Sequence, residues 1–236
     1  YHAFYKDYNL LNVYFGDNPT FPRLSYGAFA YCGIYDIRVP SSVSTISQSV
    51  FEGCINLQSV TFAQNSKIDS ISAYMFKGCN NLQYITFEQG SKLTSIQAHS
   101  FEGMDKLIGV DFGDAKLTNI DNFAFRYCTS LQSINIPEGV NYIGRYAFNL
   151  TNNLNVYFKA PTMPLNLQEN WDYGINGYYV GVQNVYTSGD YELATLLDGN
   201  TAIIKYHGIE KNIDLTQLNE GIIIQIGGYA FAHSDV

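Results

Sequence analysis

The 236-residue sequence predicts a solenoid of short parallel strands, in the α/β class and mostly β, with about 22–25 residues per rung. Three observations predict this fold. A phenylalanine recurs at that spacing, apolar residues recur at constant offsets from it, and an apolar/polar alternation follows each copy. Self-similarity at such a period is typical of repeat architectures, in which each rung packs on its neighbours.

The repeat is marked by a phenylalanine that usually follows a small or apolar residue. Its copies are Phe4, Phe29, Phe51, Phe76, Phe101, Phe125 and Phe148, at intervals of 25, 22, 25, 25, 24 and 23 residues. Phe231 adds one copy beyond a long interruption. The constancy of the interval indicates one structural unit used repeatedly.

Apolar residues keep fixed distances from each phenylalanine. An aliphatic residue lies five positions before it in every rung that includes this position, as Ile71 does before Phe76. In the same rung Leu82, Ile85 and Phe87 lie six, nine and eleven positions after it. The last two of these alternate with polar residues, which is the period of a strand with one buried face. One such unit is too small to bury a core alone, so neighbouring rungs must share one.

Two segments bring this pattern close to a known family. Residues 120–137 and 140–148 resemble the BspA-like class of leucine-rich repeats, written roughly I-G-x-x-A-F-x-x-C-x-x-L-x-x-I-x-I-P-x-x-V. The resemblance covers residues 1 to about 159 directly and residues 190–236 more loosely. It implies a right-handed leucine-rich-repeat solenoid. It further implies a bacterial surface protein, extracellular or on the cell surface, that takes part in adhesion or host interaction.

The organisation along the chain suggests three parts. Residues 1–158 form the array of seven Phe-marked rungs, and residues 159–189 form a cap and linker that contains Trp171. Residues 190–236 are expected to begin a second, truncated array, with short strands near 202–206 and 212–215. A terminal rung exposes core on one side, so Trp171 is interpreted as a packing residue rather than a ligand platform.

Charge and hydropathy exclude two classes of partner. The 13 Lys and Arg against 21 Asp and Glu give a net charge of −8, which would repel nucleic acid. No run of about 18 apolar residues occurs, so insertion into a membrane is not expected. We expect a monomeric fragment, and the missing targeting segment says nothing about the location of the whole protein.

The four cysteines lie three residues after a repeat phenylalanine, at Cys32, Cys54, Cys79 and Cys128. Other rungs place Met or Thr in this position, so a small or soft filler suffices there. The spacing favours a buried, reduced ladder. Disulfides between Cys32 and Cys54, or between Cys54 and Cys79, remain within reach as the alternative.

No residue pattern points to catalysis, a cofactor or a metal. His2 and His99 share one repeat position, and no nucleophile or carboxylate stands beside them in a triad-like order. The segment Asp111–Asp114 lacks the oxygen-rich loop of a calcium site, so a solvated turn is the preferred interpretation. We therefore expect a protein that is not an enzyme.

Two further features of the sequence, a recurrent glycine position and a glycosylation sequon, lead to structural expectations. Gly53, Gly78 and Gly103 each follow their phenylalanine by two residues, which favours a turn with positive φ over a phosphate-binding loop. The sequon Asn149-Leu150-Thr151 matters only in a glycosylating host, and Thr151 occupies the inward repeat position.

The outward side chains of the predicted strands form the candidate partner-binding face. They are Tyr14, Asp36, Arg38, Ser59, Thr61, Tyr84, Thr86, Glu88, Asp111, Ser133, Asn135, Tyr157 and Lys159. Tyrosines spaced on a polar surface suit protein or glycan recognition. Two hypotheses follow: a binding module that uses this face, or a structural stalk that presents another domain. An accessory module of an enzyme is a weaker third.

Overall fold

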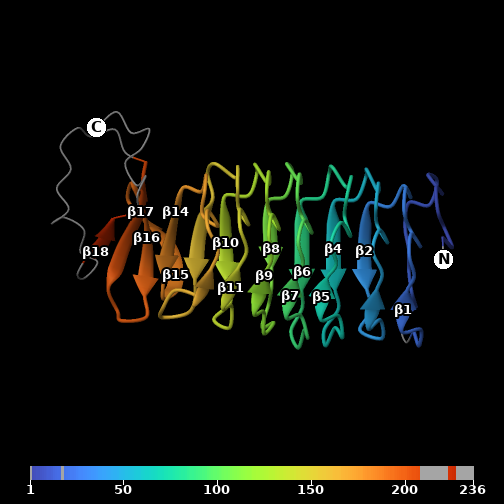
Figure 1. Cartoon of the computed structure of the whole chain (residues 1–236), viewed down its shortest axis with the longest axis horizontal. Helices are drawn as coiled ribbons and strands as arrows, with labels where there is room; N and C mark the ends of the chain where they lie inside the picture. The colour runs from blue at the N-terminus through green and yellow to red at the C-terminus, as the bar shows by residue number, and fades with distance from the viewer. Residues whose placement is uncertain (1, 17–18, 208–222, 227–236) are drawn as a thin grey trace.

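The computed structural model describes residues 2–16, 19–207 and 223–226, and its rungs stack side by side along one axis (Figure 1). The described residues form strands and turns, with no helix among them. About seven turns of short parallel strands make up the array. The predicted mostly-β solenoid is confirmed.

Each rung from the one marked by Phe29 onward contributes one longer strand to one side of the solenoid. These strands are β2 (Asp36–Val39), β4 (Ser59–Phe62), β6 (Tyr84–Phe87), β8 (Gly109–Asp111), β10 (Ser133–Ile136), β12 (Asn155–Phe158) and β14 (Gly177–Val180). Strands β2 to β8 of this set pair in parallel with their neighbours, and so do β10 to β14, all in phase with the repeat, so that Val60 of β4 lies opposite Ile85 of β6. We call the surface formed by their outward side chains the long-strand face.

A second set of short strands lines another side of the core. It consists of β1 (Arg23–Leu24), β3 (Thr45–Ile46), β5 (Ser70–Ile71), β7 (Ser95–Ile96), β9 (Asn119–Ile120), β11 (Tyr142–Ile143) and β13 (Asn166–Leu167). The second residue of each strand from β3 to β11 is the aliphatic one five positions before the repeat phenylalanine, and it is buried. Both sets of strands therefore enclose one continuous core.

The repeat phenylalanines form a stack through that core. Ring centroids of successive copies lie 5.0–6.0 Å apart, with interplanar angles of 5–26°. Phe51, Phe76, Phe101, Phe125 and Phe148 are fully buried. Identical residues at one repeat position pack on one another here because the rungs are in register, which is the shared core that the periodicity predicts.

The turn after each phenylalanine has a left-handed residue two positions on. Gly53, Gly78 and Gly103 have φ of 70°, 77° and 76°, as predicted. Tyr31 and Tyr127, at the same repeat position, also adopt positive φ. The conformation thus belongs to the position rather than to glycine. At Gly53 a Cβ would lie 2.4 Å from the Tyr31 ring, so glycine is needed there for space as well.

Parallel stacking does not stop at residue 158, where the sequence suggested that the array ends. β13 pairs with β11 and β14 pairs with β12, both in parallel, so residues 159–180 form another rung. The pairing of Leu167 with Ile143 puts Trp171 in the position of Ala147, one residue before the phenylalanine slot. Because of this offset of one residue, the rung has Asp172 rather than a phenylalanine at the repeat position.

Trp171 is a packing residue, as predicted. It is 6% exposed, and its ring lies 6.3 Å from that of Phe148 and 5.8 Å from that of Phe158. The indole thus packs edge to face against the last repeat phenylalanine of the stack, Phe148, and against Phe158 of β12.

The chain then changes from parallel to antiparallel pairing. β15 (Val182–Ser188), β16 (Tyr191–Leu196) and β17 (Thr201–Tyr206) form an antiparallel sheet, which β18 (Ile223–Ile226) joins in parallel with β17. Side chains of β16 and β17 pack on Tyr157 and Tyr179. The strand expected at 212–215 and the repeat position of Phe231 lie outside the described residues, and a second array starting at residue 190 stays a prediction.

Candidate functional site

The long-strand face presents the predicted polar residues to solvent. Along β2 and β10 burial alternates, with Ile37 and Ile134 in the core and Asp36 and Asn135 outside. The same alternation places every predicted face residue but one in an exposed or half-buried position. Tyr14, at 80%, and Tyr84, at 48%, are the exposed aromatic rings among them.

Tyr157 is the exception, and its assignment to an accessible surface is wrong. Its side chain points out of the solenoid core but is only 3% exposed, because β16 and β17 cover this end of the face. The Tyr157 hydroxyl donates to Glu192 Oε1 at 3.4 Å. Burial, followed by the nearby Glu192 carboxylate, raises the pKa of Tyr157 well above its usual range, which keeps the hydroxyl protonated as a donor.

Side chains on the N-terminal half of the face bind one another across rungs. The Arg38 guanidinium forms a two-pronged ion pair with the Glu88 carboxylate, with 2.8 Å between Nη2 and Oε2. Glu88 also accepts a hydrogen bond from the Gln64 amide, and Arg38 is the main cause of the lowered pKa of Glu88. Ser59 donates to Asp36 at 2.6 Å. These exposed contacts each contribute about 0–1 kcal/mol, so they order the surface more than they stabilise the fold.

The middle of the face is hollowed where the sheet is interrupted. In the described part of the chain β8 pairs with β6 and β10 with β12, but β8 and β10 do not pair with each other. The short strands β7, β9 and β11 remain paired through the same rungs. The backbone polar groups of β8 and β10 that face the break thus have no partner on a neighbouring strand there, among the strands described.

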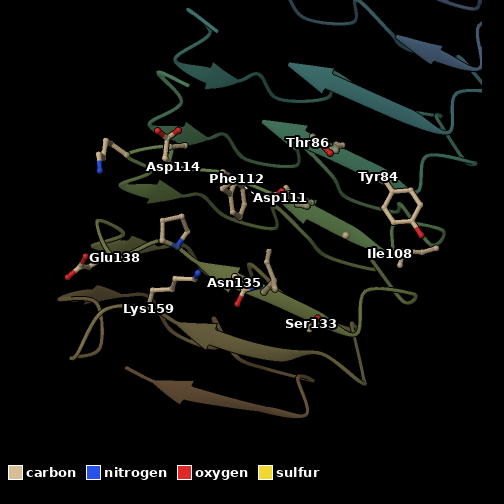
Figure 2. Close-up of a pocket in the computed structure, with 18 residues that line it drawn as sticks. Tyr84, Thr86, Ile108, Asp111, Phe112, Asp114, Ser133, Asn135, Glu138 and Lys159 are labelled. Atoms are coloured by element: carbon tan, nitrogen blue, oxygen red, sulfur yellow. Dashed lines mark hydrogen bonds between the residues drawn. The ribbon is translucent and has the colours of Figure 1, made fainter. Parts of the chain in front are cut away.

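A pocket of about 450 Å³ lies over this interruption (Figure 2). Tyr84 and Ile108 line one end of it, and Glu138 and Lys159 approach from the other. Asp111, Ser133 and Asn135 lie between them, on the strands that border the break. The pocket therefore brings together six of the predicted face residues from four rungs. These six are Tyr84, Thr86, Asp111, Ser133, Asn135 and Lys159.

Acidic, basic and neutral polar side chains meet in this pocket. Asp111 and Glu138 supply carboxylates, Lys159 supplies an ammonium group, and Ser133 and Asn135 supply neutral groups that donate and accept. Such a mixture can hydrogen-bond polar partner atoms but holds no activated nucleophile or general base in a relay. What the arrangement can do chemically is bind.

The cysteine position has a specific contact that the spacing did not reveal. All four thiols are buried and free, and each donates to the carbonyl oxygen of the preceding rung's phenylalanine. The Sγ–O distances are 3.0 Å for Cys32, Cys54 and Cys79, and 3.1 Å for Cys128. Burial raises the pKa of Cys32 to about 11, so Cys32 is held as the thiol rather than the thiolate.

His99 lies in a ladder of surface rings that sequence reasoning missed. Its ring stacks between Tyr74, at 5.3 Å, and Phe123, at 5.1 Å, and Phe123 stacks in turn on Tyr146. All four residues share the repeat position two before the core phenylalanine, and all have φ of 54–58°. His99 Nδ1 also lies 2.5 Å from Glu102 Oε2. The aromatic recurrence at one repeat position was the signal that could have predicted the ladder.

The remaining candidate positions serve local structure. Asp111 Oδ1 accepts a hydrogen bond from the Gly113 amide, and Asp114 Oδ1 accepts one from the Gly90 amide. Within residues 2–16, 19–207 and 223–226, no group of three or more His, Cys, Asp or Glu could hold a metal ion. The described residues also contain no helix that could span a membrane.

The glycosylation sequon is inaccessible in this conformation. Asn149 is 7% exposed and Thr151 is fully buried, with its hydroxyl donating to the Phe148 carbonyl at 2.6 Å. The predicted inward placement of Thr151 is confirmed.

Comparison with known proteins agrees with this geometry. The model of the BspA type leucine rich repeat region matches six copies, over residues 1–69 and 62–169. The chain belongs to this family. A repeat array of this family is a binding or structural module, and its fold is typically not enzymatic. No match was found among proteins with curated descriptions.

Two solved structures are similar to the chain. A leucine-rich repeat protein from Bacteroides ovatus ATCC 8483 is 25% identical, with a TM-score of 0.51 over 64% of this chain and 37% of that one. A leucine rich cell surface protein from Faecalibacterium prausnitzii A2-165 is 16% identical, with a TM-score of 0.46 over 83% of this chain and 66% of that one. The matched region thus spans little more than a third of the Bacteroides ovatus protein.

Proposed function

We propose that this BspA-type chain is a non-catalytic binding module that recognises protein or glycan partners through its long-strand face. The observation that carries the proposal is the pocket over the gap between β8 and β10, where six face residues from four rungs converge. An extended face built by stacked rungs is the surface that solenoids use for macromolecular partners. Location at the cell surface, in adhesion or host interaction, is what the resemblance to BspA-like proteins implies.

The composition of the face supports recognition of a macromolecule. Tyr84 offers a half-exposed ring with a polar tip, which adds contact area at low conformational cost. Ser133 and Asn135 beside it can both donate and accept hydrogen bonds. A partner seated here would contact an aromatic anchor at one end and charged groups at the other.

A structural stalk is the second candidate, and the N-terminal half of the face favours it. Arg38 and Glu88 neutralise each other, and Ser59 satisfies Asp36, so these side chains have partners already. Surface groups paired in this way suit a solvated spacer as well as a binding surface.

Binding of the isolated chain to immobilised matrix proteins, mucins and glycan arrays tests the proposal. Tyr84→Ala should weaken binding at least about fivefold if this ring anchors the partner. Tyr74→Ala is the matched control, because Tyr74 is similarly exposed, at 45% against 48%, but lies in the surface ring ladder. If the chain binds nothing while a longer protein that contains it does bind, the stalk is correct.

A further inference from the structure

A second pocket lies where the antiparallel sheet meets the solenoid. It measures about 560 Å³, within the roughly 300–1,000 Å³ of small-molecule sites. Gln132 and Ser133 come from the β10 rung, Asn152, Asn153 and Asn155 from the β12 rung, and Gly174, Ile175 and Asn176 from the β14 rung. Glu192 of β16 and Lys205 of β17 complete it from the antiparallel sheet. Neither sheet alone makes this pocket, which did not emerge from the repeat pattern.

Side-chain amides dominate the lining. Gln132, Asn152, Asn153, Asn155 and Asn176 each carry one carbonyl oxygen and one NH₂ group. A carboxamide can accept from and donate to the same partner, which matches a sugar hydroxyl, itself both donor and acceptor. Apolar ligands find little complementary surface here, and the Glu192 carboxylate and Lys205 ammonium offset each other, so the lining has no net charge that favours an anion such as phosphate.

Part of the lining is held in place before any ligand arrives. Asn176 Nδ2 donates to Asn155 Oδ1 at 2.7 Å, and the Asn155 side chain also hydrogen-bonds to Tyr157. The Tyr157 hydroxyl donates in turn to Glu192, which links the solenoid rungs to the antiparallel sheet. This continuous chain of hydrogen bonds fixes the orientation of its members, and preorganised groups lose less entropy when a ligand binds.

Other polar groups of the pocket remain available. Within the described residues, the side chains of Gln132, Asn152, Asn153 and Lys205 make no hydrogen bond or ion pair. The pocket therefore combines a fixed part with unpaired donors and acceptors around it, which is the arrangement that orients a small polar ligand.

From this geometry we infer that the pocket binds a neutral sugar unit of a glycan, a hexose or an N-acetylhexosamine, through its hydroxyl groups. The inference does not depend on the proposed partner face, because the pocket is lined largely by other residues. The Glu192 carboxylate accepts from sugar hydroxyls, the side-chain amides both accept from and donate to them, and Lys205 donates to a further oxygen.

Saturation-transfer NMR on the full chain, with a panel of neutral hexoses, N-acetylhexosamines and their disaccharides at millimolar concentration, tests the inference. At least one sugar should bind. Gln132→Ala and Asn153→Ala should each weaken it about 2- to 10-fold, as expected for the loss of one hydrogen bond.

Gln58→Ala is the matched control for Gln132→Ala. Both glutamines follow the repeat leucine by one residue and are exposed, but Gln58 does not line the pocket. Gln58→Ala should leave sugar binding unchanged, and so should the face variant Tyr84→Ala, which separates this site from the long-strand face. Thermal unfolding of each variant verifies that the fold is intact.

Three results would overturn the inference: no neutral sugar binds, binding is insensitive to both pocket variants, or short peptides bind while sugars do not.

Discussion

Each repeat phenylalanine is packed between the rings of the rungs before and after it. The Phe76 centroid lies 5.7 Å from that of Phe51 and 5.9 Å from that of Phe101, and the side chain is fully buried. Thr86, on the long-strand face of the same rung, is only half-buried and points away from the core. Two residues ten positions apart in one rung should thus contribute very differently to stability.

Phe76→Ala should lower the free energy of unfolding by about 3–5 kcal/mol, because it opens a cavity in the middle of the stack. Thr86→Ala should change it by no more than about 0.5 kcal/mol, since no core contact is lost. Denaturant unfolding of both variants checks this, and equal effects would show that the inward and outward assignment is wrong.

The buried Cys32 thiol should make stability depend on pH in the alkaline range. The pKa of Cys32 rises from 9.0 to about 11 on burial, so the folded state holds this proton at a pH where the unfolded chain releases it. Stability from this group is complete below pH 9 and is lost as the pH rises toward the folded pKa.

Unfolding free energy should therefore decline between pH 9 and pH 11, and Cys32→Ala should make that decline shallower. Urea unfolding of both proteins across this range provides the measurement. An identical pH slope in the two proteins would mean that the Cys32 thiol does not contribute.

The antiparallel sheet covers one end of the long-strand face. β16 and β17 supply Ala194, Ala202 and Ile204, which cover Tyr157 and Tyr179. The Tyr179 hydroxyl donates to the Ile204 carbonyl at 3.3 Å. This packing takes part of the long-strand face out of solvent and creates the amide-lined pocket beside it.

Ile204→Ala should lower the free energy of local unfolding of the antiparallel sheet by about 2–5 kcal/mol, because Ile204 is fully buried against the two tyrosines. Amide hydrogen exchange should accelerate in β15–β17 while β4 and β6 keep their protection, since rungs contact only their neighbours. Lys205→Ala, at the exposed next residue of the same strand, is the control. Equal acceleration in β4 and β6 would contradict a locally packed sheet.

For the whole molecule, net charge limits the range of partners. The net charge of −8 and the sequence pI of about 4.8 give an acidic protein at neutral pH. The few cations near the candidate sites, such as Arg38 and Lys159, stand beside carboxylates or other polar groups. No extended positive field therefore steers a polyanion to the surface.

At about 0.15 M salt and neutral pH the chain should not be retained by heparin or shift the mobility of duplex DNA. Replacement of Lys159 by Ala should make no difference to either measurement. Retention on heparin that falls as salt is raised would show that local charge outweighs net charge.

Sequence alone determined the solenoid, its period and most of its inward and outward assignments. These features repeat in every rung, and strand alternation fixes the side of the sheet on which a residue lies, as Ile85 and Thr86 show. The buried thiol slot at Cys54 and the positive φ at Gly53 followed from the same repetition.

Only the tertiary structure decided where the repetition is broken. The rung that carries Trp171 is offset by one residue, the sheet is interrupted between β8 and β10, and the antiparallel sheet buries Tyr157. Each of these features depends on contacts between segments that are not related to each other by the sequence repeat. Both candidate pockets arise at such breaks, because a regular stack of rungs leaves its face evenly filled and its backbone groups paired.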